Sequence, residues 1–95
     1  MITFHPEVAS DLAEAVHHYG QVSGRLADEF LEEFRRLLAI AAQNPQRFHP
    51  MGRGFRRANL RRFPFHFIYR ELADGIRVIL VRHHRRDPDY GLGRE

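Results

Sequence analysis

The period at which apolar residues recur changes once along the chain, near residue 45, and this change restricts the fold more than any other feature. Before it, apolar side chains recur every three or four residues, as in Leu26, Phe30 and Phe34, which is the spacing of a helix face. After it they alternate with other residues, as in Phe65 and Phe67, which is the spacing of a strand face. Helices followed by strands predict an α+β fold in which the helices pack on one face of a sheet.

Two helices are expected in the first half of the chain. The first should cover about residues 6–21, because Pro6 suits the first turn of a helix and Ser23 and Gly24 interrupt the apolar pattern. The second should end near Asn44, since Pro45 restricts the residue before it. The short connection between them predicts an antiparallel helical hairpin.

The remaining elements are strands. Residues 45–54 are rich in proline and glycine, and their composition predicts a loop. The segment 73–75 predicts a turn, and the strand after it is apolar on both faces, as expected of an interior strand. The expected strands cover residues 2–4, 55–60, 63–70 and 76–83. The whole chain, residues 1–95, is therefore predicted to be one two-layer domain of order β-α-α-β-β-β, with the helical hairpin packed on a twisted antiparallel sheet and the aromatic strand face in the core.

Size and composition exclude several classes of protein. Ninety-five residues without cysteine leave one modest core and no disulfide scaffold or thiolate metal site. No apolar run approaches the roughly 20 residues that a membrane span needs. The first residues lack the basic and apolar stretches of a signal peptide, so a cytoplasmic protein is expected.

The charge is divided unevenly along the chain. All 15 basic residues are arginines, and the net charge is −3 over residues 1–50 but +6 over residues 51–95. A basic half of this kind indicates a surface that binds a polyanion or an acidic protein. Alternation along the predicted strand places Arg57 and Arg61 on one face and Arg56 and Arg62 on the other. The arginines expected to contact a partner or target are Arg53, Arg56, Arg57, Arg61, Arg62, Arg85 and Arg86.

The segment that follows the last strand carries arginines, imidazoles and a tyrosine, as in His83, His84, Arg86 and Tyr90. Imidazole can transfer protons near neutral pH, guanidinium can stabilise phosphate charge, and tyrosine can stack on a base. The alternative is a solvated basic tail whose arginines pair with acids on the two helices.

A metal site is not expected. The histidine pairs 17–18 and 83–84 are chain neighbours, whose side chains point apart on a helix or a strand, and there is no His-Glu-x-x-His motif. A serine nucleophile is not expected either, because none of Thr3, Ser10 and Ser23 lies in a glycine-flanked turn. No cofactor is predicted.

Several short motifs occur in a characteristic order. They are His5-Pro6-Glu7, Ala27-Asp28-Glu29-Phe30, Asn44-Pro45, Arg57, Arg61-Arg62-Phe63-Pro64-Phe65, Tyr69-Arg70 and Val81-x-His83-x-x-Arg86-Asp87-Pro88. Together they resemble the RelE/ParE family of bacterial toxins from type II toxin–antitoxin systems, over essentially the whole chain. The resemblance implies the toxin fold of that family and an acidic antitoxin as partner.

The resemblance also implies one of two activities. RelE-type toxins cut mRNA on the ribosome, whereas ParE-type toxins inhibit DNA gyrase without chemistry of their own. The chain has His66 where RelE-type toxins carry a basic residue in the third strand, and it has no lysine. Its Phe-Pro-Phe strand and its His-x-x-Arg-Asp-Pro end are more similar to the ParE type.

Three hypotheses follow from the sequence. The first is a growth-inhibiting toxin of the plasmid-stabilisation type, neutralised by an acidic antitoxin, that inhibits gyrase by binding. The second is a ribosome-dependent endoribonuclease in which Arg57 and Arg86 hold the scissile phosphate, His83 or His84 moves the proton and Tyr90 positions a base. The third is a non-toxic RNA-binding or interaction module.

Overall fold

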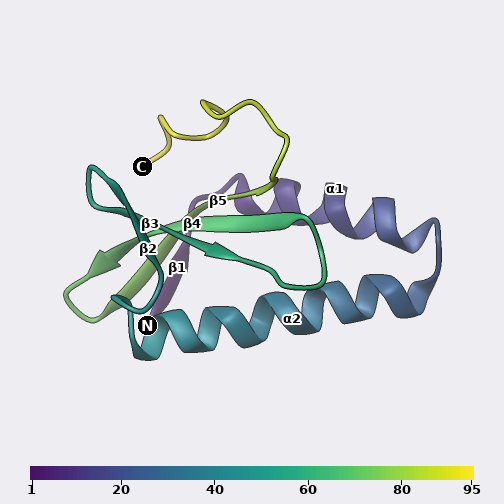
Figure 1. Ribbon diagram of the computed structural model, residues 1–95, viewed down its shortest axis with the longest axis horizontal. Helices are drawn as coiled ribbons and strands as arrows, with labels where there is room; N and C mark the ends of the chain where they lie inside the picture. The colour runs from purple at the N-terminus through teal and green to yellow at the C-terminus, as the bar shows by residue number, and fades with distance from the viewer.

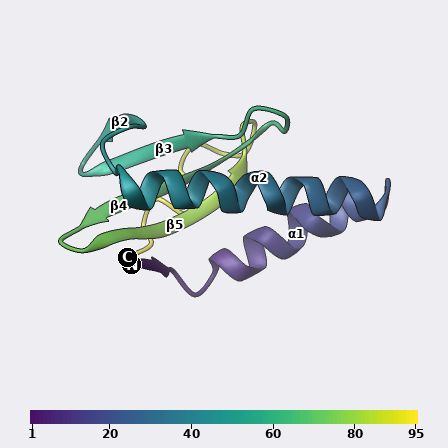
Figure 2. The ribbon, with the colours of Figure 1, turned by 90° about the horizontal axis from the view of Figure 1, so that it is seen from below.

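The computed structural model describes all residues, 1–95, and has two layers, a helical hairpin and a five-stranded sheet (Figures 1 and 2). No helix is both long enough and apolar enough to cross a membrane. The elements in chain order are β1 (Ile2–Phe4), α1 (Val8–Gly20), α2 (Gly24–Gln43), β2 (His49–Gly52), β3 (Phe55–Asn59), β4 (Phe65–Leu72) and β5 (Gly75–His83).

The strand order in the sheet is β1-β5-β4-β3-β2, so the α+β architecture is confirmed and β5 is an interior strand as predicted. The sheet is mixed rather than antiparallel, because β1 pairs in parallel with β5 while the other neighbours are antiparallel. The connection from β1 to β5 contains both helices and the three other strands, and a long connection of this kind permits parallel pairing. Three residues of extended chain carry no signal for strand direction.

The structure adds one strand that the sequence did not predict, because β2 lies within the segment 45–54 that was expected to be a loop. It is a short edge strand paired with β3, and the pairing is irregular between Pro50 and Gly52. Proline lacks the N–H that an interior strand would need, so the edge of a sheet can accept it. The composition of this segment is typical of a loop, and the four residues of β2 are all exposed, so no apolar alternation indicated a strand.

The helical hairpin begins its second helix with a side-chain cap. Ser23 Oγ accepts a hydrogen bond from the backbone N–H of Leu26 at 3.0 Å, which satisfies one of the free N–H groups of α2. The apolar stripes of both helices then pack on the aromatic face of β4, as predicted. Phe30 and Phe65 meet edge to face at 5.3 Å between ring centroids, and Phe34 and Phe67 at 5.4 Å.

The face of the sheet turned away from the helices carries a second, smaller apolar cluster. It consists of Phe55, Ile68, Ile79 and Leu80, and Leu92 of the C-terminal segment packs against it. Figure 2 shows this segment, in yellow, behind the sheet when the helices are in front. We call this side of the sheet the outer face; the polar residues described next lie at one end of it.

Candidate binding site

Two histidines and two arginines form a hydrogen-bonded chain on the outer face. Arg82 Nε donates to His66 Nε2 at 2.9 Å, the two Nδ1 atoms of His66 and His84 are 2.9 Å apart, and Arg57 Nη2 lies 3.3 Å from His84 Nδ1. The imidazole rings of His66 and His84 are stacked, with centroids 5.1 Å apart. Antiparallel pairing of β4 with both β3 and β5 sets His66 opposite Asn59 on one side and Arg82 on the other. We call Arg57, His66, Arg82 and His84 the Arg-His chain.

The donors of the two arginines fix the tautomers of both imidazoles. A guanidinium can only donate, so His66 Nε2 must offer a lone pair to Arg82. The proton of neutral His66 then lies on Nδ1 and is donated to His84 Nδ1. His84 Nδ1 also accepts a hydrogen bond from Arg57 Nη2. His84 therefore carries its own proton on Nε2, which has no acceptor within the protein.

Both imidazoles are held neutral. Burial is the main cause that lowers the pKa of His66 to about 3, and the nearby positive charges of Arg57 and Arg82 lower it further. The pKa of His84 is also lowered, first by burial and then by Arg57 and His83. Near neutral pH the charge of the Arg-His chain thus lies on its arginines alone.

Arg82 also holds the C-terminal segment in place. Its Nη1 donates to the backbone carbonyl oxygens of Pro88 and Tyr90, at 2.8 and 3.0 Å, and its side chain is buried. One guanidinium therefore joins the Arg-His chain to residues 87–90.

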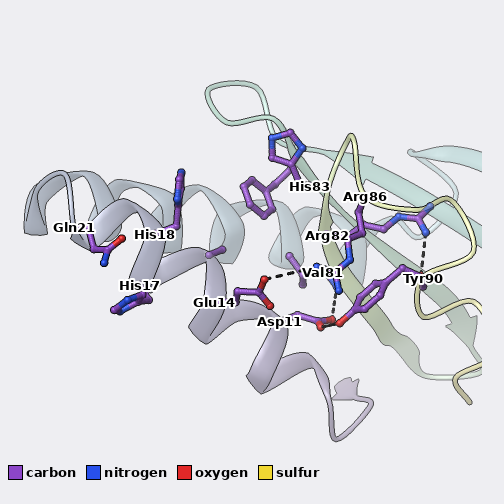
Figure 3. Close-up of a pocket in the computed structure, with 12 residues that line it drawn as sticks. Asp11, Glu14, His17, His18, Gln21, Val81, Arg82, His83, Arg86 and Tyr90 are labelled. Carbon is purple, nitrogen blue, oxygen red and sulfur yellow. Dashed lines mark hydrogen bonds and ion pairs between the residues drawn. The ribbon is translucent and has the colours of Figure 1, made fainter.

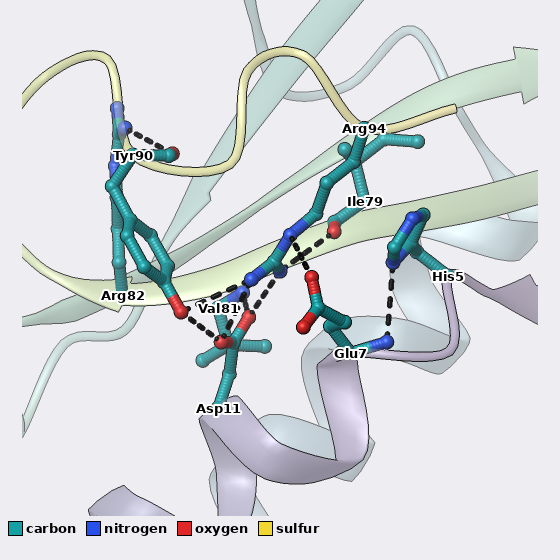
Figure 4. A network of polar contacts seen from close by, with 8 residues as sticks. All are labelled: His5, Glu7, Asp11, Ile79, Val81, Arg82, Tyr90 and Arg94. Atoms are coloured by element: carbon teal, nitrogen blue, oxygen red, sulfur yellow. Dashed lines mark hydrogen bonds and ion pairs between the residues drawn. The ribbon is translucent and has the colours of Figure 1, made fainter.

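A second polar network joins the end of the chain to α1 (Figure 4). The Asp11 carboxylate accepts from Tyr90 Oη at 2.6 Å and from Arg94 Nη1 at 2.7 Å. It also accepts from the backbone N–H of Val81, and Arg94 donates to the carbonyl of Ile79. β1 covers only the first part of β5, up to Val78, so Asp11 and Arg94 satisfy backbone groups on the part of the β5 edge that β1 leaves free.

A groove of about 350 Å³ lies between α1 and the segment that follows β5 (Figure 3). Arg86 contacts both walls: its guanidinium lies 4.0 Å from the centre of the Tyr90 ring, and its Nη1 is 3.6 Å from Glu14. The His83 ring packs edge to face on Phe65 at 5.2 Å. The polar lining of the groove includes Glu14, His17, His18, His83, Arg86 and Tyr90.

The five residues that the ribonuclease hypothesis requires are not brought together. Arg57 and His84 meet on the outer face, whereas His83, Arg86 and Tyr90 line the groove beside α1. Successive residues at the end of β5 point to opposite faces, which separates His83 from His84. The tail arginines Arg86 and Arg94 pair with acids of α1, which is the arrangement that the tail alternative described.

The arginines expected to bind a partner divide into two groups. Arg62 and Arg86 form ion pairs with Glu29 and Glu14, and Arg56 donates to backbone carbonyls in the loop before β2. The others form no ion pair within the chain; they are Arg53, Arg57, Arg61 and Arg85.

The expected alternation of arginines across β3 is wrong beyond Asn59, where the strand ends. Arg61 and Arg62 lie in the following loop, and their backbone N–H groups donate to the buried carboxylate of Glu33 on α2. This tertiary anchor, which no strand pattern encodes, decides the direction of the loop.

Sequence reasoning missed several residues of the site. Asn59, Arg82 and Asp11 were not among the candidates. The spacing of His66 and Arg82 in the sequence carries no sign that they face each other, because strand register decides it. An arginine within an apolar strand was the one available signal, since a buried guanidinium needs acceptors.

Comparison with known proteins places this arrangement in a family. The family described as "ParE toxin of type II toxin-antitoxin system, parDE" matches residues 2–88, which include both helices and all five strands. The chain belongs to the ParE toxin family. The resemblance to ParE-type toxins noted in the sequence is thereby confirmed.

Solved structures agree with the fold of this ParE family member. Nine chains of known structure match it. Among them is one described as "Chromosomal ParDE TA system from P. aeruginosa", with a TM-score of 0.73, 20% sequence identity, and coverage of 86% of this chain and 92% of that one. At this identity the likeness shows the shared fold. A search of curated protein sequences gave no match.

Proposed function

We propose that the chain is the toxin of a toxin–antitoxin pair and inhibits DNA gyrase by binding. The observation that carries the proposal is the ParE family match over residues 2–88. Growth inhibition, a plasmid-stabilising role and a cytoplasmic site of action belong to the same proposal. The ParDE description of the structural neighbour is consistent with a partner antitoxin.

We propose that an acidic antitoxin neutralises the toxin by docking on its basic half. Arg53, Arg57, Arg61 and Arg85 support this proposal, because no carboxylate of the chain pairs with them. Charges left without partners steer an oppositely charged protein and strengthen its binding. Arg56, Arg62 and Arg86 are the less available members of the predicted surface, since each already has acceptors within the chain.

Action by binding is favoured over ribonuclease chemistry by the state of the histidines. A general base needs a free lone pair within reach of the proton that it takes. His84 Nδ1 already accepts from His66 and Arg57, and its Nε2 carries the proton. His83 Nδ1 accepts from the backbone N–H of Arg85, and this ring lies away from Arg57.

Expression of the chain in bacteria without its antitoxin tests the proposal. We expect growth arrest together with induction of a DNA-damage reporter, because a poisoned gyrase leaves broken DNA. Co-expression of the acidic protein from the adjoining reading frame should restore growth. Growth arrest with new 5′ ends in ribosome-bound mRNA and no damage response would favour the endoribonuclease. Unaffected growth would contradict both and favour an interaction module.

A further inference from the structure

Three donor groups at the exposed end of the Arg-His chain have no acceptor within the protein. Arg57 Nε donates to Asn59 Oδ1 at 2.7 Å and its Nη2 is directed at His84, but its Nη1 is free. Because Asn59 presents its oxygen to the guanidinium, its amide NH₂ group points the other way. The third donor is His84 Nε2–H, which the tautomer argument leaves facing solvent. We call Arg57, Asn59 and His84 the donor corner.

The donor corner is positively charged, and no carboxylate of the chain forms an ion pair with it. None of the ion pairs of the chain involves Arg57, Arg82 or His84. Two further exposed arginines without ion pairs are close in sequence, Arg61 two residues after Asn59 and Arg85 directly after His84. Oriented donors around positive charge, with every local acceptor already used, form a site for an anion.

The arrangement of the donors favours a phosphate over a carboxylate. A carboxylate is planar and is satisfied by one guanidinium that presents two parallel N–H groups. Here two of the three nitrogens of Arg57 are already engaged, and the free donors come from three different side chains. A tetrahedral phosphate has oxygens in several directions and can accept from all three.

We propose that the donor corner of Arg57, Asn59 and His84 binds a phosphodiester of a nucleic-acid backbone. Arg61 and Arg85 would then lie beside the neighbouring phosphates of the same strand. The site binds and does not cleave, because His84 offers no free lone pair to an attacking hydroxyl. The inference goes beyond the proposed function, since it does not depend on which protein the toxin inhibits.

Titration of the isotope-labelled chain with a 12-base-pair DNA duplex and, separately, with an RNA hairpin tests the site. We expect the side-chain amide signals of Asn59 and the imidazole signals of His84 to shift. Arg57→Gln should weaken binding roughly tenfold and lower the slope of log affinity against log salt by about 1, as expected for the loss of one phosphate contact. Arg35→Gln is the matched control, because Arg35 is an exposed arginine on α2 in the opposite layer.

Asn59→Asp provides a second variant that keeps an oxygen for Arg57 Nε while it removes the donor and adds a negative charge. It should weaken binding at least as much as Arg57→Gln if the site is correct. Equal losses from Arg35→Gln and Arg57→Gln would overturn the proposal, because binding would then follow net charge alone. Binding of an acidic peptide at the donor corner with no binding of either nucleic acid would also overturn it. Preference between DNA and RNA identifies the source of the phosphate.

Discussion

At the scale of single residues, the fixed donors of Arg57 and Arg82 determine where the protons of two histidines lie. Arg82 makes His66 an acceptor at Nε2, and His66 in turn donates to His84. The Arg-His chain thus leads from the buried Arg82 to the exposed imidazole of His84, whose Nε2–H donor faces solvent. Both imidazoles need to be neutral for this arrangement, so its stability depends on pH.

Acid should weaken the fold through His66. Its pKa is about 3 in the folded protein and near 6.5 in an unfolded chain, so between these values the unfolded state binds the additional proton. The stability from neutral His66 is complete above about pH 6.5 and is lost as the pH falls toward 3. From pH 7 to pH 5 the free energy of unfolding should fall by up to about 2 kcal/mol from this residue. Urea unfolding at the two pH values measures it.

His66→Gln is the comparison for this prediction. Glutamine has an oxygen that can accept from Arg82 and an NH₂ group that can donate to His84, but it does not titrate. We expect the variant to lose less stability than the parent chain between pH 7 and pH 5. An equal loss in both proteins would show that His66 is not the responsible group.

Asp11 is the residue whose replacement should cost most in the C-terminal network. Its side chain is 3% exposed, that of its partner Arg94 is 11% exposed, and Asp11→Asn would leave the largely buried Arg94 charge with only the exposed Glu7 carboxylate as a counter-ion. The removal of one partner from a buried pair costs about 3 kcal/mol or more. Glu7→Gln is the control, because Glu7 is 66% exposed and lies 3.7 Å from the same guanidinium, so its loss should cost less than about 1 kcal/mol. Similar values for both variants in chemical unfolding would contradict the role of Asp11.

At the scale of elements, β5 is completed by parts of the chain that are distant in sequence. β1 pairs with its first residues, and beyond that point Asp11 of α1 and Arg94 of the C-terminal segment satisfy its free edge. The turn between β4 and β5 must also let β1 approach closely. Gly75 permits this, because a Cβ at that position would lie 1.8 Å from the carbonyl oxygen of Met1.

Gly75→Ala should therefore displace the start of β1. The backbone must move to remove the contact with Met1, and the hydrogen bond from Ile76 N–H to Met1 O would be weakened. We expect a loss of about 2 kcal/mol and faster amide hydrogen exchange at Ile76. Gly24→Ala is the matched control, since no atom lies within 4 Å of its added Cβ and the residue begins α2, so stability should be unchanged or slightly higher. Unchanged exchange at Ile76 in Gly75→Ala would refute the close-approach argument.

The elements that the sequence predicts well are those with long, regular patterns. The apolar stripe of α2 and the aromatic alternation of β4 each repeat several times, and both elements were found, although β4 begins and ends two residues later than predicted. β2 has four residues, all of them exposed, so no pattern indicated that it exists. β1 is only three residues long, so no pattern indicated its direction. The candidate site was predictable only in part. Arg57 and His84 could be named as candidates from the chemistry of their side chains, whereas the contacts that join them to His66 and Arg82 are decided by strand register.

At the scale of the whole molecule, the two faces of the sheet differ in what covers them and in their polar content. The helical hairpin buries one face and forms the main core, with aromatic rings in edge-to-face contact. The outer face has a smaller apolar cluster, covered in part by Leu92, and the Arg-His chain at one end. The strongly basic half of the sequence thus contributes internal structure as well as charge, since Arg82 and Arg94 hold the C-terminal segment while Arg53, Arg57, Arg61 and Arg85 are without ion pairs.

Inhibition of purified DNA gyrase is the most direct test of the central claim that this ParE family member acts by binding gyrase. The chain should reduce ATP-dependent supercoiling of relaxed plasmid, or trap cleaved plasmid, and addition of its antitoxin should restore supercoiling. Full supercoiling at a large excess of folded toxin, together with cleavage of ribosome-bound mRNA by the same preparation, would contradict the account.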